Sequence, residues 1–125
     1  MIVGIGVDIV EIERLRETLA RQQDRFIRRV FTEAEQKYCA AHRDPVPHYA
    51  ARFAAKEALF KALGTGWAKG VSWQDAEVIR ADTGAPVLVL HGEAEKFSLK
   101  LGARTAHLSL THSNDSAVAV VILEQ

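Results

Sequence analysis

Several features are scarce in this sequence, and each absence narrows what the protein can be. The 125 residues contain one cysteine, Cys39, so an internal disulfide is excluded and a reducing, cytoplasmic location is expected. Basic and acidic residues balance at 16 each, so no global charge favours nucleic acid or a membrane as partner. No apolar run approaches the roughly 20 residues that span a bilayer. Met1 leads straight into a strand-like segment without a basic stretch, so we expect no secretory signal.

The short motifs of common phosphate and hydrolase sites are also missing. The chain has no Walker loop, no G-x-G-x-x-G, no nucleophile elbow, no zinc-ligand spacing and no internal repeat. Any phosphate binding would therefore depend on scattered arginine, lysine and histidine side chains and a metal ion. With 48% apolar and 26% charged residues, the composition is that of a single globular domain over residues 1–125.

The order of the predicted elements indicates an α+β fold. The first strand is remote in sequence from the others, helices come in the middle, and hairpins follow. The predicted elements are a strand over 2–12, two helical pieces within 11–30, helices over 33–41 and 52–63, a hairpin over 75–90, a helix over 93–101 and a hairpin over 105–123.

A capping-box signature marks the start of the helix over 33–41. Thr32 stands at the N-cap and Glu35 three residues later, a pair that satisfies two backbone donors at a helix start. The apolar spacing then predicts that Ala34, Tyr38 and Ala41 face the core.

The chain is organised around its central helix, Arg52–Leu63, which two glycines follow. One narrow stripe of this helix holds only small side chains, so another backbone could approach closely there: Ala51, Ala55, Ala58 and Ala62. On the opposite side Glu57 lies between Phe53 and Phe60. A carboxylate against apolar surface needs a cation or a hydrogen-bond donor. The alternative is an exposed pair of Glu57 with Lys61, four residues on.

A second carboxylate is oddly placed in the first strand. Asp8 follows Gly4 and Gly6 on one face of the strand. Aspartate is disfavoured inside strands, and glycine weakens them. The two glycines predict open space in front of the carboxylate, which suits a ligand or metal site. A bulge or a strand end, with Asp8 capping a turn, is the other interpretation.

Arginines are concentrated near the N-terminus, and one later histidine, His112, also stands out as a residue that could bind an anion. Residues 11–30 hold six arginines against four acidic residues, a local net charge of +2 in a neutral protein. This segment is either a solvated helix surface or a docking patch for an acidic partner. His112 ends one face of its strand. A lone histidine is more often structural, but near a phosphate it is a useful donor.

Four blocks of the sequence together resemble one known family. They are Gly4-Ile-Gly-Val-Asp8-Ile-Val-Glu-Ile-Glu-Arg14, Phe31-Thr-Glu-Ala-Glu35-Gln-Lys-Tyr38, Arg52-Phe-Ala-Ala-Lys-Glu57-Ala-Leu-Phe-Lys61-Ala-Leu-Gly-Thr-Gly66 and His107-Leu-Ser-Leu-Thr-His112-Ser. In this order they resemble the holo-[acyl-carrier-protein] synthases, the small 4′-phosphopantetheinyl transferases of bacterial fatty-acid synthesis. The resemblance implies that family's fold, a small antiparallel sheet with a long central helix and shorter helices.

The resemblance also implies a reaction and a set of site residues. The phosphopantetheine arm of coenzyme A would pass to a serine of apo-acyl carrier protein, with Mg²⁺ as cofactor and adenosine 3′,5′-bisphosphate as the other product. Asp8 and Glu57 match the family's metal-binding carboxylates, and Mg²⁺ prefers such oxygen ligands. Lys61 is expected to stabilise the phosphates. Glu57 and a water on the metal both remain open as the catalytic base. Arg52 and His112 match positions near the nucleotide phosphates.

The resemblance also bears on how the protein docks its carrier and how its subunits assemble. Acyl carrier proteins are strongly acidic, so Arg14, Arg21 and Arg25, at roughly helical spacing, are expected to receive the carrier. The family resemblance implies a homotrimer with its sites at subunit boundaries, where residues 64–90 of a neighbour complete the site.

The rival functions are a carrier-binding or nucleotide-binding module without activity, a transferase that serves polyketide or peptide synthases, and a metal-dependent phosphohydrolase.

Overall fold

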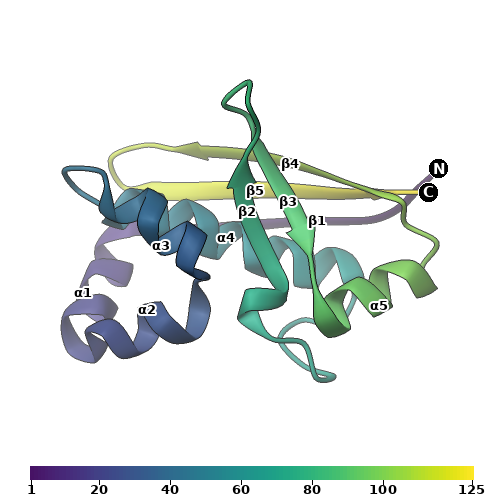
Figure 1. Ribbon diagram of the computed structural model, residues 1–125, viewed down its shortest axis with the longest axis horizontal. Helices are drawn as coiled ribbons and strands as arrows, with labels where there is room; N and C mark the ends of the chain where they lie inside the picture. The colour runs from purple at the N-terminus through teal and green to yellow at the C-terminus, as the bar shows by residue number, and fades with distance from the viewer.

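A long helix packed across a three-stranded antiparallel sheet forms the frame of the protein. The computed structural model describes all 125 residues. The sheet has the order β1 (Ile2–Glu11), β5 (Ser116–Glu124), β4 (Thr105–His112), and the helix α4 (Val46–Leu63) runs beneath it (Figure 1). The first and last strands are therefore neighbours, and the two termini lie side by side. None of the helices is both long and apolar enough to cross a membrane.

The remaining elements are α1 (Ile12–Gln22), α2 (Asp24–Val30), α3 (Glu33–Ala40), a short turn over Trp73–Asp75, β2 (Ala76–Arg80), β3 (Pro86–Leu90) and α5 (Gly92–Lys100). Of these elements, the first three helices lie at one end of this frame and the last helix at the other, with the β2–β3 hairpin between them (Figure 1). β2 and β3 form a separate hairpin. The predicted break between the first two helices is confirmed at Gln23, whose φ of 54° lies in the left-handed region. The predicted α+β class and antiparallel sheet are confirmed as well.

The glycines of β1 are needed because the strand lies almost in contact with the backbone of α4. A Cβ atom at Gly6 would lie 1.9 Å from the carbonyl oxygen of Ala58, and one at Gly4 would lie 2.3 Å from that of Ala62. The expectation that the alanine stripe admits another backbone is confirmed. The helix backbone fills the room at Gly4 and Gly6, so the glycines do not provide the open space predicted in front of Asp8.

The other face of the sheet is apolar and uncovered. Ile5, Val7 and Ile9 alternate with the glycines and are 67%, 55% and 64% exposed. In the strand register they pair with Ile122, Val120 and Val118 of β5. A continuous band of branched aliphatic side chains therefore faces outward, although such surfaces are rarely left open in soluble proteins.

A buried ion pair fixes α4 to the elements beside it. The Nζ atom of Lys56 lies 2.7 Å from Oε1 of Glu35, and both side chains are fully buried. Nζ also donates to the carbonyl oxygens of Trp73 and Ala76, and Glu35 accepts from the Val78 amide at 2.8 Å. Because every polar atom of the pair has a partner, it sets the rotation of α4 against α3 and β2.

The burial predicted for α3 is wrong in part. The capping box of Thr32 and Glu35 is present. Ala34 and Ala41 are nevertheless exposed, and Tyr38 is half-buried. The helix instead turns Glu35 and Cys39 inward, because the demand of Lys56 for a counter-ion outweighs the small apolar gain from two alanines. Burial also raises the pKa of the Cys39 thiol to about 12, as befits a packing residue.

Candidate active site

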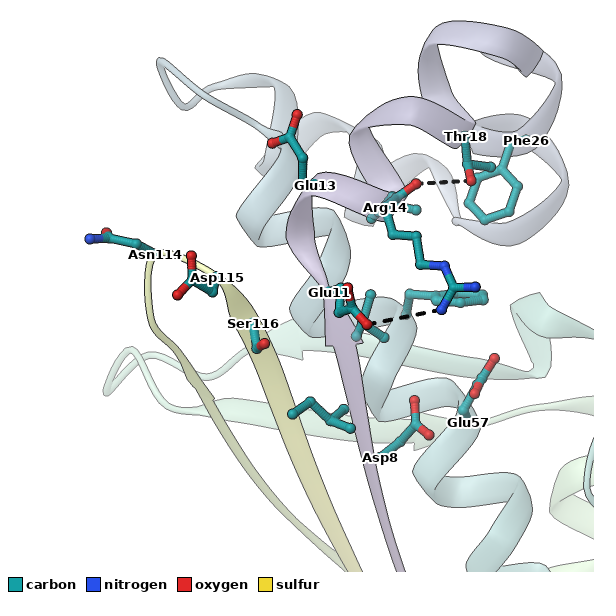
Figure 2. A pocket seen from close by; sticks show the side chains of 14 residues that line it. Asp8, Glu11, Glu13, Arg14, Thr18, Phe26, Glu57, Asn114, Asp115 and Ser116 are labelled. Carbon is teal, nitrogen blue, oxygen red and sulfur yellow. Dashed lines mark hydrogen bonds and ion pairs between the residues drawn. The ribbon is translucent and has the colours of Figure 1, made fainter.

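The two carboxylates singled out in the sequence meet between β1 and α4. Figure 2 shows Asp8 on the strand and Glu57 on the helix beside each other, with Arg14 of α1 above them. Lys61, one turn beyond Glu57, donates to Asp8 Oδ1 at 2.9 Å and to the carbonyl oxygen of Val7 at 3.1 Å. Lys61 forms no ion pair with Glu57, so the alternative of an exposed helix pair is wrong.

One of the two carboxylate oxygens of Asp8 has no hydrogen-bond partner. Its side chain is 10% exposed, and its Oδ2 atom is buried without a hydrogen-bond partner. A buried carboxylate oxygen without a partner is costly, so the position calls for a cation or a donor that a ligand supplies. The interpretation of Asp8 as the cap of a turn is wrong, because Asp8 lies inside β1, paired with Ala119.

Glu57 is held in an environment that opposes its charge. Burial raises the pKa of Glu57 to about 7; the negative charge of Asp8 adds to the rise, and Lys61 opposes it. The flanking rings are in place, since Phe53 and Phe60 both pack against Trp73, with ring centroids 5.1 and 5.6 Å apart. Two carboxylates this close repel each other, and a divalent cation would relieve the repulsion.

The donor set fits Mg²⁺ rather than a metal that needs a closed protein cage. The structure holds no group of three or more His, Cys, Asp or Glu residues suited to a metal. Mg²⁺ is commonly held by one or two carboxylates and completes its octahedron with substrate phosphates and water. Asp8 and Glu57, with the free Oδ2 atom, match that pattern.

A cleft of about 980 Å³ opens beside the two carboxylates. Its walls come from β1, α1, α2, α4 and the turn between β4 and β5 (Figure 2). The turn residues Asn114, Asp115 and Ser116 were not predicted from the sequence. Their place follows from the pairing of β1 with β5, which brings the Asp115 carbonyl oxygen within 2.9 Å of the Ile12 amide. No local sequence pattern predicts the pairing of β1 with β5.

The three arginines proposed for docking occupy two helices. The side chain of Arg14 is 80% exposed, lines the cleft and lies 3.9 Å from Glu11. Arg21 lies two turns further along the same face of α1 and donates to Thr18 Oγ1 at 3.5 Å. Arg25 is exposed on α2, beyond the break at Gln23, so the helical spacing does not extend to it.

Arg52 and His112 lie away from the carboxylate pair, in a second cluster. Arg52 is 4% exposed and its guanidinium carbon lies 4.1 Å from the centre of the Tyr38 ring. The ring of His112 lies 5.8 Å from that of His48, which neighbours Arg52 on α4. Neither Arg52 nor His112 lines the cleft at Asp8 and Glu57. Within one chain, the residues expected to contact the substrate therefore form two separate groups, one at Asp8 and Glu57 and the other at Arg52 and His112.

Comparison with known proteins identifies the family. The model of the 4′-phosphopantetheinyl transferase superfamily matches residues 4–121. The chain belongs to this superfamily. It is 50% identical to the holo-[acyl-carrier-protein] synthase of Koribacter versatilis over 99% of both chains. It is 46% identical to the synthase of Maridesulfovibrio salexigens over the full length of both.

Solved structures of the superfamily share the whole fold. The holo-[acyl-carrier-protein] synthase of Neisseria meningitidis superposes with a TM-score of 0.91 at 32% identity, over 100% of both chains. The Bacillus anthracis synthase, described in complex with CoA (3′,5′-ADP), gives 0.82 at 40% identity over 100% of this chain and 98% of the other. A Helicobacter pylori synthase described in complex with coenzyme A gives 0.84 at 30% identity over 96% and 99%.

Proposed function

We propose that this phosphopantetheinyl transferase moves the 4′-phosphopantetheine group of coenzyme A to a serine of apo-acyl carrier protein. The products are holo-acyl carrier protein and adenosine 3′,5′-bisphosphate. The observation that carries the proposal is the pairing of Asp8 with Glu57, in a chain whose full-length relatives are holo-[acyl-carrier-protein] synthases. We assign the reaction to fatty-acid synthesis in the cytoplasm, where Cys39 would stay reduced.

The chemistry follows from the charges at the pair. Asp8 and Glu57 would hold Mg²⁺, which when bound offsets negative charge on the pyrophosphate as its bond breaks. The ammonium of Lys61 is half exposed, so it can turn from Asp8 towards a phosphate oxygen and add to that stabilisation. The serine hydroxyl also needs a base, and either Glu57 or a water on the metal would accept its proton.

A single incubation tests this function. Purified protein is mixed with Mg²⁺, coenzyme A and apo-acyl carrier protein, and the carrier is weighed by mass spectrometry. A mass gain equal to phosphopantetheine supports the proposal. Hydrolysis of coenzyme A without modification of the carrier would instead indicate a phosphohydrolase. An unchanged carrier with intact coenzyme A would indicate a binding module.

Binding of Mg²⁺ should depend on pH through Glu57. The raised pKa means that Glu57 is about half protonated at pH 7, and a metal must displace that proton. Affinity for Mg²⁺ measured by calorimetry should be about tenfold weaker at pH 6 than at pH 8. Glu57→Gln, which cannot titrate, should bind weakly with little change over this range. The same pH dependence in wild type and variant would show that Glu57 is not a ligand.

Charge reversal at Arg14 tests the docking surface. Arg14→Glu should raise KM for the carrier about tenfold and leave KM for coenzyme A nearly unchanged, because exposed charges act mainly on encounter. Added salt should shrink the difference between wild type and variant. Arg104→Glu, at an exposed arginine outside the cleft, is the matched control. Equal effects on both substrates would argue against a surface specific for the carrier.

The uncovered sheet face supports a homotrimer with shared sites. Its aliphatic band would be buried between subunits, and the second cluster of one subunit could complete the carboxylate site of the next. The test mixes Glu57→Ala with a chain that carries Arg52→Lys and His112→Ala, after both are unfolded and refolded together. If the sites are shared, about a quarter of the subunit boundaries receive two intact halves, and activity returns to that level. No recovery in confirmed mixed trimers would mean that each chain carries a complete site.

A further inference from the structure

The packing of α4 does not by itself fix the rotation of the helix about its axis. Of its 18 residues 13 are buried, and six of these are alanines. An apolar stripe normally determines which face of a helix turns inward. In α4 the buried side chains surround the helix, and successive alanines present nearly the same surface, so burial distinguishes only weakly between neighbouring rotations.

The contacts of α4 with β1 leave this rotation open. Gly6 lies against the carbonyl oxygen of Ala58, so backbone and small side chains meet there without a directional bond. Lys61 does bond to Asp8, at 2.9 Å, but its side chain is 53% exposed and can turn towards a phosphate. A side chain that follows the substrate does not hold the helix in place.

Lys56 supplies directional bonds outside the alanine stripe of this helix. Its side chain is fully buried, and its Nζ atom donates to Glu35 Oε1 at 2.7 Å and to the carbonyl oxygen of Trp73 at 3.2 Å. A third bond goes to the carbonyl oxygen of Ala76. An ammonium has three donors, so all of them are used. Because the acceptors come from α3 and from the segment that leads into β2, they define one position for Nζ and thereby one rotation of α4.

Glu35 is itself held rigidly. Its Oε1 atom accepts from the Thr32 amide at 2.9 Å, and its Oε2 atom accepts from the Val78 amide at 2.8 Å. The first bond belongs to the capping box of α3, and the second joins the pair to β2. Every polar atom of the pair therefore has a partner of fixed position, and a fully satisfied buried network specifies a single arrangement.

Stability alone does not account for a charged pair at this depth. Desolvation of two buried charges offsets most of their attraction, and apolar replacements of similar volume often leave a protein as stable as before. Neither Lys56 nor Glu35 lines the cleft, so neither contacts a substrate there. The contribution of the pair is therefore expected to lie in the arrangement that it selects.

Lys56 is followed directly by Glu57, and this transmits the rotation to the candidate active site. Consecutive side chains of an α-helix project about 100° apart. A turn of α4 by about 20° would shift a carboxylate that lies about 6 Å from the axis by about 2 Å. Asp8 and Glu57, which lie beside each other in Figure 2, would then no longer suit one Mg²⁺ ion, because its octahedral geometry tolerates little displacement.

We propose that Lys56 and Glu35 are positioning residues, whose buried pair fixes the rotation of α4 at which Glu57 meets Asp8. The pair touches neither the substrate nor the metal and acts through the helix. Because Lys61 belongs to the same helix, the pair also orients the ammonium that is expected to meet the phosphates. The proposal rests on the proposed function for the identity of the metal and the reaction, whereas the rotation of α4 is a property of the chain alone.

A double variant, Lys56→Met with Glu35→Gln, removes both charges and keeps the side chains at similar size. Glutamine still accepts from the Val78 amide, so the variant should fold and melt close to the wild-type temperature. Its dissociation constant for Mg²⁺, measured by calorimetry without substrate, should rise about tenfold. In its crystal structure α4 should be turned relative to β1, with Asp8 and Glu57 further apart.

The kinetic effects should divide between chemistry and docking. The value of kcat for carrier modification should fall about 10²-fold, because a misplacement of about 1 Å near the reacting groups has that effect. KM for the carrier should stay within about twofold of wild type, because exposed charges such as Arg14 act on encounter and do not contact the pair. Glu35→Gln alone keeps an acceptor for Lys56 and should show the same losses to a smaller extent.

Leu123→Ala, at a fully buried residue of β5 outside the pair and the cleft, is the matched control. It should lower the melting temperature and leave the affinity for Mg²⁺ unchanged. Wild-type Mg²⁺ affinity and kcat in a folded double variant would overturn the proposal. Failure of both the double variant and Glu35→Gln to fold would overturn it too, since the pair would then serve stability. If the wild type bound Mg²⁺ without modifying the carrier, the proposed function would fail, while calorimetry and the crystal structure would still decide the role of the pair.

Discussion

Asp8→Asn should lower kcat/KM for formation of the holo-carrier by about 10³-fold, since a metal at the pyrophosphate contributes several kcal/mol to the transition state. Asparagine keeps the size of the side chain and can still accept from Lys61, but the buried Oδ2 loses its charge. The loss should therefore arise from chemistry and metal affinity, while the melting temperature changes little. The measurement is the initial rate of carrier modification over a range of Mg²⁺ concentrations.

Glu95→Gln, at an exposed carboxylate of α5 outside the cleft, is the matched control for the loss of a negative charge. If Asp8→Asn turned over at a near-normal rate with an unaltered Mg²⁺ requirement, Asp8 would not be a metal ligand. The carboxylate pair would then need another explanation.

Gly6→Ala should destabilise the fold by about 3 kcal/mol or more, because the new methyl group would overlap the backbone of α4, which cannot move aside as a side chain can. Relief requires β1 to move away from the helix. That movement would separate Asp8 from Glu57 and Lys61, so activity should fall with stability. Denaturant unfolding measures the first effect and the carrier assay the second.

Gly64→Ala separates the clash from the cost of the substitution itself. Gly64 has a φ of 80° but nothing within 4 Å of its would-be Cβ atom, so alanine there meets backbone strain alone, about 1 kcal/mol. Similar losses at both positions would mean that the close approach of β1 to α4 is not what the glycine of the strand provides.

The sequence predicted the helices, the strands and the residues that lie together on one element. It predicted less well which residues of different elements contact each other. Helical periodicity placed Glu57 between two phenylalanines and Lys61 one turn on, and strand alternation singled out Asp8; the structure brings the three together. These signals are local, so a single segment contains them. The inward turn of Glu35 is not local, because it depends on Lys56 arriving from another helix.

The second cluster shows the same limit. The spacing of His42 and His48 across the Asp44–Pro47 break follows no period, since the chain changes direction there. Only the fold reveals that their rings stack and that His112 lies beside them. Similarly, the role of Gly4 and Gly6 became clear from the approach of the helix backbone, which the strand alone does not encode.

The pairing of β1 with β5 has a consequence for synthesis of the chain. Among the elements of this fold β1 is synthesised before all the others, and its strand partner, Ser116–Glu124, is synthesised after them. Throughout translation its backbone donors and acceptors have no strand to pair with, and its aliphatic side chains stay open to other nascent chains. Contacts so distant in sequence also slow the search for the native state. A chaperone that binds extended apolar segments should therefore engage residues 2–11 and release them once β5 is complete.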